Sequence, residues 1–251
     1  MNIQAWEKIS EEYYKEILSP LKDSKKNPLF EDIKKINSKK KKSVVDLGCG
    51  IGEVEGFLSK NFKEVVGIDF SKKMILQAKE KNKSLKNIKF YLGDISNLKE
   101  FHNKFDLAIS INSMISSNIG QIDNMFREAN KILKNKGKFI CILPAMEVFI
   151  YQSLIIAENE AEKEKDNKKI RKKIRTLIKP KEHDFLLGLT NFEGEQKNYY
   201  FFEILWRLKK AGFKKIKIKK VLYSWKEFED AGQGYFPKED LPWDWYAICE
   251  K

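Results

Sequence analysis

Cysteine and histidine are scarce in this sequence of 251 residues, which has three cysteines and two histidines. Cys49, Cys141 and Cys249 lie far apart and form no Cys-x-x-Cys pair. The sequence therefore predicts neither a disulfide framework nor a zinc site, and we expect no bound metal. Unpaired cysteines are typical of a reducing compartment, so we expect a cytoplasmic protein.

Arginine is also rare, although the chain has a formal net charge of +13. The arginines are Arg127, Arg171, Arg175 and Arg207, and lysine supplies nearly all of the positive charge. Arginine, more than lysine, binds phosphate groups in a bidentate manner. The net charge by itself therefore does not indicate a nucleic-acid partner.

Long uninterrupted apolar runs are missing as well. The most apolar stretch, 139–157, contains Pro144, Glu147 and Gln152. A strand followed by a buried helix explains it better than a membrane span, so we expect no membrane partner. No basic segment followed by an apolar one opens the sequence, so we expect no secretory signal. A composition of 42% hydrophobic and 34% charged residues instead favours a folded globular protein.

Strand-like and helix-like segments alternate from residue 43 onward. Short apolar runs predict strands at Ser43–Leu47, Glu64–Asp69, Ile88–Leu92, Phe105–Ile111 and Lys138–Leu143. Helical spacing predicts helices at Glu53–Lys60, after a cap at Ser71, and at Ile122–Leu133. This alternation predicts an α/β fold with a doubly wound, mostly parallel sheet that binds ligands at the carboxyl ends of its strands.

The C-terminal part departs from that alternation. A helix at Tyr199–Ala211 precedes two predicted strands, Lys214–Tyr223 and Trp245–Cys249, with no helix between them. We expect these strands to pair antiparallel and to complete a seven-stranded sheet whose last strand is antiparallel. Residues 146–197 are apolar at first and then dense in both charges, which predicts a helical insertion after the fifth strand. We expect an N-terminal helical segment at 1–42 and one domain at 43–251.

The most informative motif is VVDLGCGIGEVEGFLSK at 44–60, where Gly48, Gly50 and Gly52 follow a strand and precede a helix. Glycines allow a tight turn and a close approach of a ligand to the main chain. A dinucleotide site needs Gly-x-Gly-x-x-Gly, but the third position here is Glu53, whose charge repels a pyrophosphate. A positively charged ligand without phosphates suits this loop better.

The motif resembles the first motif of the class I S-adenosylmethionine-dependent methyltransferases. The resemblance covers 44–143 closely and the last two strands in topology. It implies a Rossmann-like methyltransferase domain and S-adenosylmethionine as the cofactor. It also implies cofactor-binding residues, which are Asp46, Gly48, Cys49, Gly50, Asp69, Phe70, Asp94, Ile95 and Asn112.

The resemblance gives these residues separate roles. Asp46 would lie near the methionine amino group, Asp69 would accept both ribose hydroxyls, and Asp94 would accept from the adenine amino group. Asn112 would face the methionine part or the methyl acceptor. An aspartate that ends a strand is often only a turn residue. Three of them beside one glycine loop favour a ligand site.

Methyl transfer needs a base only when the acceptor arrives protonated. His183 in the insertion is the candidate catalytic residue, although a histidine on a surface loop explains it too. The N-terminal segment has an apolar stripe at Trp6, Ile9, Tyr13, Ile17 and Leu18. Such a helix covers the cofactor in many members of the family, so Tyr13 is a further candidate contact, while core packing explains the stripe equally well.

The acceptor is less well specified. Enzymes that methylate planar amino groups carry Asn/Asp-Pro-Pro-Tyr/Phe after the fourth strand, where this chain has SINSM at 110–114. The lysines at 39–42 and 214–220 do not converge on the strand ends. We therefore expect a small-molecule acceptor. An RNA or protein acceptor held by the lysine-rich insertion, and a cofactor-binding protein without catalysis, stay open as alternatives, and the sequence predicts no oligomeric state.

Overall fold

The computed structural model describes residues 19–36, 41–178, 180–191, 194–228 and 240–251. The predicted N-terminal amphipathic helix, and with it Tyr13, lies outside the described residues. Within these ranges, no helix has both the length and the apolar character needed to cross a membrane.

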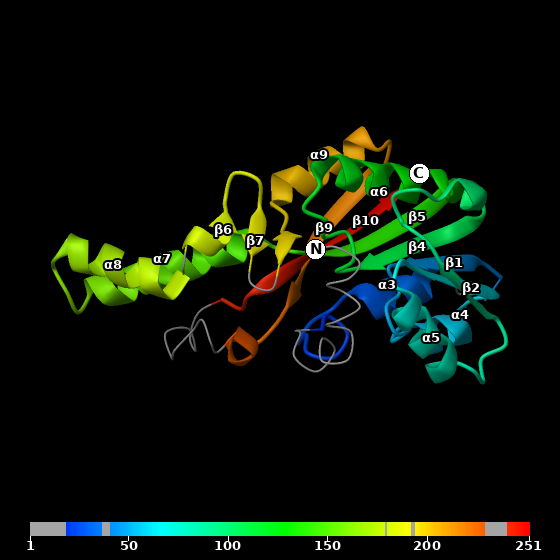
Figure 1. The fold of residues 1–251 in the computed structure, drawn as a ribbon, viewed down its shortest axis with the longest axis horizontal. Helices are drawn as coiled ribbons and strands as arrows, with labels where there is room; N and C mark the ends of the chain where they lie inside the picture. The colour runs from blue at the N-terminus through cyan, green and yellow to red at the C-terminus, as the bar shows by residue number, and fades with distance from the viewer. Residues whose placement is uncertain (1–18, 37–40, 179, 192–193, 229–239) are drawn as a thin grey trace.

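A seven-stranded sheet forms the centre of the molecule, in the order β3-β2-β1-β4-β5-β10-β9 (Figure 1). Its strands are β1 (Ser43–Leu47), β2 (Glu64–Asp69), β3 (Ile88–Leu92), β4 (Phe105–Ile111), β5 (Leu133–Pro144), β9 (Lys214–Leu222) and β10 (Trp243–Glu250). The first five strands pair in parallel, whereas β10 is antiparallel to both β5 and β9. The predicted doubly wound sheet with an antiparallel end is therefore confirmed.

Helices cover both faces of this sheet. They are α3 (Leu29–Ile36), α4 (Glu55–Asn61), α5 (Lys72–Lys81), α6 (Ile119–Lys131) and α9 (Phe201–Lys210). Figure 1 shows α6 and α9 on one face and α3, α4 and α5 on the other. Val44 and Val45, successive residues of β1, belong to different hydrophobic clusters, because side chains alternate between the faces of a strand.

The helix boundaries differ from the predicted ones by one to three residues, and the starts of α4 and α6 show why. α4 begins at Glu55 rather than Glu53, since the glycine loop continues to that point. α6 begins at Ile119, three residues early, because the Asn118 side chain accepts a hydrogen bond from the Gln121 N–H at 3.1 Å and caps the helix. Apolar spacing detects the buried face of a helix but not its cap.

The insertion after β5 contains two helices, α7 (Glu147–Ala161) and α8 (Asn167–Ile178), which we call the arm. Figure 1 shows the arm extending away from the sheet, beyond the end at which β5 finishes. The helical prediction for 146–197 covers only this part. A second sheet follows, with strands β6 (His183–Asp184), β7 (Leu189–Asn191) and β8 (Glu195–Lys197).

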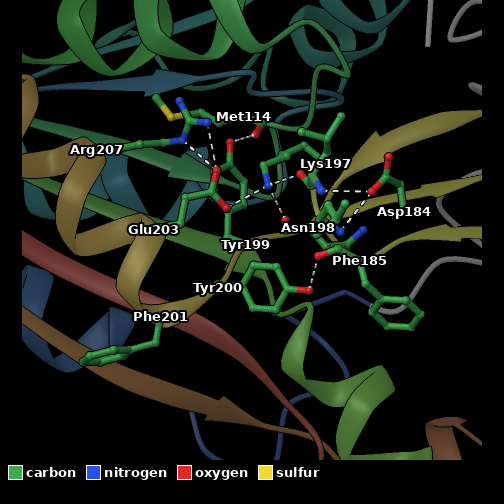
Figure 2. A network of polar contacts seen from close by, with 12 residues as sticks. Met114, Asp184, Phe185, Lys197, Asn198, Tyr199, Tyr200, Phe201, Glu203 and Arg207 are labelled. Atoms are coloured by element: carbon green, nitrogen blue, oxygen red, sulfur yellow. Dashed lines mark hydrogen bonds and ion pairs between the residues drawn. The ribbon is translucent and has the colours of Figure 1, made fainter.

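A buried lysine connects the small sheet to the main domain (Figure 2). Lys197 is 2% exposed, and its ammonium donates to the Leu187 and Asn198 carbonyls and to Glu203 Oε2, at 2.7, 2.8 and 2.7 Å. Arg207 of α9 donates to Glu203 Oε1 at 2.8 Å. Because the donors around Glu203 come from β8 and α9, they fix the small sheet against α9.

Candidate cofactor site

The glycine loop between β1 and α4 forms the centre of the site. Gly48, Gly50 and Gly52 have φ angles of 74°, 52° and 73°, a left-handed conformation that favours glycine. The Gly48 and Cys49 N–H groups both donate to the Ile68 carbonyl of β2, at 2.7 and 3.1 Å. The loop is therefore held against the carboxyl end of the neighbouring strand.

Asp69, the last residue of β2, also holds this loop. Its Oδ2 accepts from the Gly50 N–H at 2.9 Å and its Oδ1 accepts from the Ser71 N–H at 2.8 Å. Burial raises the pKa of Asp69, and these backbone donors oppose the rise. The Asp69 carboxylate thus holds the backbone of the glycine loop in place. The predicted role at the ribose did not include this structural contribution.

Asp46, the fourth residue of β1, lies beneath the loop and is buried. Burial raises its pKa to about 7, a hydrogen bond from the Glu55 carboxyl opposes the rise, and the charge of Asp69 adds to it. Its Oδ1 has no hydrogen-bond partner among the described residues. Two buried carboxyl groups side by side are unfavourable when both are ionised, so this position suits a ligand that brings positive charge or N–H groups.

Glu55, at the start of α4, is a residue that the sequence analysis missed. It is fully buried, and its carboxyl group lies within hydrogen-bond reach of the Asp46 carboxylate. Burial first, and then the charge of Asp46, raise its pKa well above the usual range. The same surroundings raise the pKa of the Cys49 thiol, which makes Cys49 a neutral side chain rather than a nucleophile.

The loop after β4 closes onto the glycine loop. Ser113 Oγ donates to the Leu47 carbonyl at 2.5 Å. A side chain at Gly48 would collide with it, since a Cβ there would lie 2.2 Å from the Ser113 Cβ. Gly48 is therefore required both by its φ angle and by this contact.

Asn112, which follows β4, belongs to a polar cluster that reaches the last strand. Its backbone has a φ of 48°, unusual for a residue with a side chain. Its Nδ2 donates to Asp244 Oδ2 at 3.1 Å, and the Tyr223 hydroxyl donates to the same oxygen at 2.6 Å. The Asn112 Oδ1 is buried without a hydrogen-bond partner among the described residues. A donor on a ligand would satisfy it.

Asp244, at the start of β10, was not among the predicted site residues. Burial raises its pKa to about 6, while hydrogen bonds from Tyr223, Asn112 and the Ala145 N–H oppose the rise. Because β10 is antiparallel to β5, its first residues lie at the carboxyl ends of the parallel strands. Asp244 therefore lies at the predicted ligand-binding end of the sheet, although it comes from the C-terminal part of the chain.

The residues predicted to contact the adenine do not gather at one place as Asp46 and Asp69 do. Asp94 is exposed, and its Oδ1 accepts from the Ser96 N–H at 2.8 Å, as in a turn. Ile95 is buried in the core, and Phe70 is half-buried. The Gly93 N–H donates to the Asp69 carbonyl at 2.9 Å, which places the turn after β3 next to Asp69. The structure brings Asp46 and Asp69 together, with Asp94 at the periphery.

His183 lies in β6, and its ring packs against Phe149 and Phe185 with centroid separations of 4.6 and 5.5 Å. None of the contacts described for His183 involves the glycine loop or the strand-end acids. Its catalytic role stays a prediction that the geometry does not test.

Comparison with known proteins shows which family shares this sequence and fold. Residues 38–206 match the family model described as methyltransferase domain. Over 113 residues the chain is 32% identical to the demethylmenaquinone methyltransferase of Staphylococcus saprophyticus, a match covering 44% of this chain and 48% of that protein. The chain thus spans about half the length of the curated relatives it matches.

Solved structures share the fold at low sequence identity. An S-adenosylmethionine-dependent methyltransferase from Mesorhizobium loti aligns with a TM-score of 0.62 and 16% identity, over 89% of this chain and 96% of that one. The [4+2]-cyclase SpnF aligns with a TM-score of 0.58 and 15% identity, over 89% and 79%. One fold therefore hosts different reactions. The family-model match, which covers more than half of the chain, shows that this protein belongs to the methyltransferase domain family, with the class I fold.

Proposed function

We propose that this protein is an S-adenosylmethionine-dependent methyltransferase that acts in the cytoplasm on a small-molecule acceptor. The observation that carries the proposal is a pair of buried carboxyl groups, Asp46 and Glu55, which lie close enough to share a hydrogen bond and whose pKa values are both raised by burial. They lie beneath a loop of left-handed glycines. A cationic ligand with an ammonium group fits this arrangement, whereas a pyrophosphate would meet like charge.

The chain offers a binding group for each part of this cofactor. Asp46 and Glu55 would neutralise the ammonium group, Asp69 would accept from the ribose, and the turn at Asp94 would border the adenine. Because Asp69 already accepts two backbone N–H groups, it would bind the ribose through its remaining acceptor positions. When bound, the cofactor supplies a methyl group already activated by the sulfonium.

The remaining work of the protein is to position the acceptor. Alignment of two reactants can lower a barrier by about 7–11 kcal/mol, so this class of transfer does not depend on a strong base. Asn112, with its unsatisfied Oδ1, would accept a hydrogen bond from an O–H or N–H of the acceptor and orient it. The Asp244 carboxylate fixes the Asn112 amide, so that Oδ1 is the atom presented to the ligand.

Two observations favour a small acceptor. The chain has no Asn/Asp-Pro-Pro-Tyr/Phe tetrapeptide after β4, and its curated relatives are named as demethylmenaquinone methyltransferases. A nucleic-acid acceptor is the second candidate, because one face of α8 in the arm is strongly cationic.

Isothermal titration with S-adenosylmethionine and with its demethylated product tests the cofactor. We expect both to bind, and Asp46→Asn to weaken binding at least tenfold. Asp106→Asn is the matched control, since Asp106 lies at the start of β4 and pairs with Lys134 at 2.9 Å, at the opposite end of the sheet. Absence of binding to folded wild-type protein would contradict the proposal. Transfer of a labelled methyl group to a small-molecule extract then tests the acceptor class.

A further inference from the structure

One face of α8 carries four cations, Lys168, Arg171, Lys172 and Arg175, which together with Thr176 line a hollow of about 420 Å³. None of the four side chains has a carboxylate partner among the described residues. The lysines on the flank of the same helix differ, because Lys169 pairs with Glu164 at 3.0 Å and Lys173 pairs with Glu160 at 2.8 Å. Acidic residues thus neutralise the flank but leave the hollow charged.

Helix periodicity explains why these cations converge. Positions 168, 171, 172 and 175 follow the spacing i, i+3, i+4, i+7 and therefore share one face, over about 10 Å at 1.5 Å per residue. Ile170 is buried and Ile174 packs in the cluster that contains Ile155 and Ile156 of α7. The apolar side of α8 is thus directed into the arm and its cationic side is directed outward.

The chemistry of this face is that of a phosphate site. Among the described residues, every charged group lining the hollow is a hydrogen-bond donor, and two are guanidinium groups, which match phosphate oxygens in a bidentate manner. Half of the four arginines in the whole sequence lie here, in a chain that otherwise uses lysine. A row of donors over two helical turns suits a chain of phosphates better than a single phosphate.

We propose that this cationic face of α8 binds the phosphodiester backbone of a nucleic acid. The residues of the face include no aromatic ring on which a base could stack, so binding would depend on phosphates and not on sequence. A lipid bilayer is less suited, because interfacial helices place apolar side chains beside their cations, and this face has none. Figure 1 shows α8 at the far end of the arm, away from β1 and β2, so the surface is separate from the cofactor site.

Fluorescence anisotropy with a labelled 20-nucleotide RNA, and with DNA of the same sequence, tests the proposal on the full chain. We expect both to bind, and Arg171→Ala/Arg175→Ala to raise the dissociation constant at least tenfold. If those two arginines contact phosphates, the slope of log K against log salt falls in magnitude by about 1.4, at 0.7 per contact for a single strand. The double variant Lys214→Ala/Lys217→Ala removes equal charge from exposed positions of β9 and should change neither quantity.

Three results would overturn the proposal: no binding of wild-type protein to either oligonucleotide at 50 mM salt, equal losses in the two double variants, or binding confined to phosphatidylglycerol vesicles. Equal losses would show that only the net charge matters. Circular dichroism of each variant establishes that α8 is still folded. Titration of the arginine variant with S-adenosylmethionine should give the wild-type affinity, so this proposal and the proposed function succeed or fail separately.

Discussion

The Asn112 amide donates to Asp244 Oδ2 at 3.1 Å. This hydrogen bond connects the loop after β4 to the start of β10, 132 residues later in the chain. The contact has two parts that can be separated, namely the amide and the left-handed backbone of Asn112. A pair of substitutions at this position distinguishes them.

Asn112→Gly removes the amide and keeps a residue suited to the φ of 48°, whereas Asn112→Ala also adds backbone strain. We expect Asn112→Gly to lower the free energy of unfolding by about 1–2 kcal/mol, since a buried carboxylate loses a donor. Asn112→Ala should lower it by about 1 kcal/mol more. Urea unfolding measures both. Equal stability of the two variants would show that the backbone is unstrained.

The stability contributed by the Asn112–Asp244 contact depends on pH. Burial raises the pKa of Asp244 from its usual value of 3.8 to about 6, so the folded state holds its proton more tightly than the unfolded state. The stability that this group contributes is complete below pH 4 and is lost as the pH rises through 6. Losing the Asn112 donor should raise that pKa further. We therefore expect the deficit of Asn112→Gly to be larger at pH 8 than at pH 5, and equal deficits would contradict this.

The Asp46–Glu55 pair predicts a stabilising substitution. Both carboxyl groups have raised pKa values, to about 7 for Asp46, so their contribution to stability falls as the pH rises from 4 through 7. Glu55→Gln puts a neutral side chain with its own N–H donor beside Asp46 at every pH, so it should increase the free energy of unfolding at pH 8 by about 1–3 kcal/mol, with a flatter pH profile.

Glu53→Gln is the control for that substitution. Glu53 lies two residues earlier in the chain and pairs with Lys22 at 2.5 Å, so its neutral variant should gain no stability. Urea unfolding of both variants at pH 5 and pH 8 makes the comparison. A Glu55→Gln protein that is less stable than wild type at pH 8 would contradict this prediction and show that the Glu55 carboxyl makes a contact that the amide cannot replace.

Gly48 and Gly56 form a matched pair for the glycine loop. Gly48→Ala combines a φ of 74° with a Cβ only 2.2 Å from the Ser113 Cβ. We expect a loss of at least about 2 kcal/mol in the free energy of unfolding and of measurable cofactor binding. At Gly56, within α4, an added Cβ meets nothing within 4 Å, so Gly56→Ala should stabilise by about 0.5–1 kcal/mol. Thermal unfolding measures both variants. If the two substitutions changed the stability in the same direction, the assigned role of Gly48 would be wrong.

Lys197 predicts a local effect on the small sheet. Lys197→Met leaves the Leu187 and Asn198 carbonyls without their donor, and Glu203 with Arg207 alone. We expect a loss of about 2–4 kcal/mol and faster proteolysis within 183–197. Lys169→Met removes an exposed lysine from its pair with Glu164 and should leave both measurements near wild type. Unchanged proteolysis in Lys197→Met would show that other contacts hold the small sheet.

The sequence was sufficient to predict the strands and helices whose buried residues form a pattern within the element itself. β2 and β4 have the predicted bounds, Glu64–Asp69 and Phe105–Ile111, because each is a continuous apolar run between turn residues. The short strands β6, β7 and β8 were missed because two or three residues are too few to show a period of two. Their position depends on the contacts of Lys197 with Glu203 and the neighbouring carbonyls.

The same contrast applies to the cofactor site. Asp46, Asp69 and the glycines were predicted because they belong to one motif or end successive strands. Glu55 was missed because a glutamate at the start of a helix is ordinarily solvated, and only the fold shows that it is buried. Asp244 was missed because its partner is 132 residues away, a distance over which no local pattern extends.

The position of β10 between β5 and β9 also bears on how the protein assembles during synthesis. β9 leaves the ribosome before β10, yet its sheet contacts are with β10 alone among the described strands. Until β10 emerges, one edge of β5 has no partner strand among the described elements, and β9 has only the short backbone pairing of Leu222 with Lys26. A nascent chain that lacks β10 therefore exposes two strand edges, which favours aggregation, and the native sheet is complete only when β10 pairs with both neighbours.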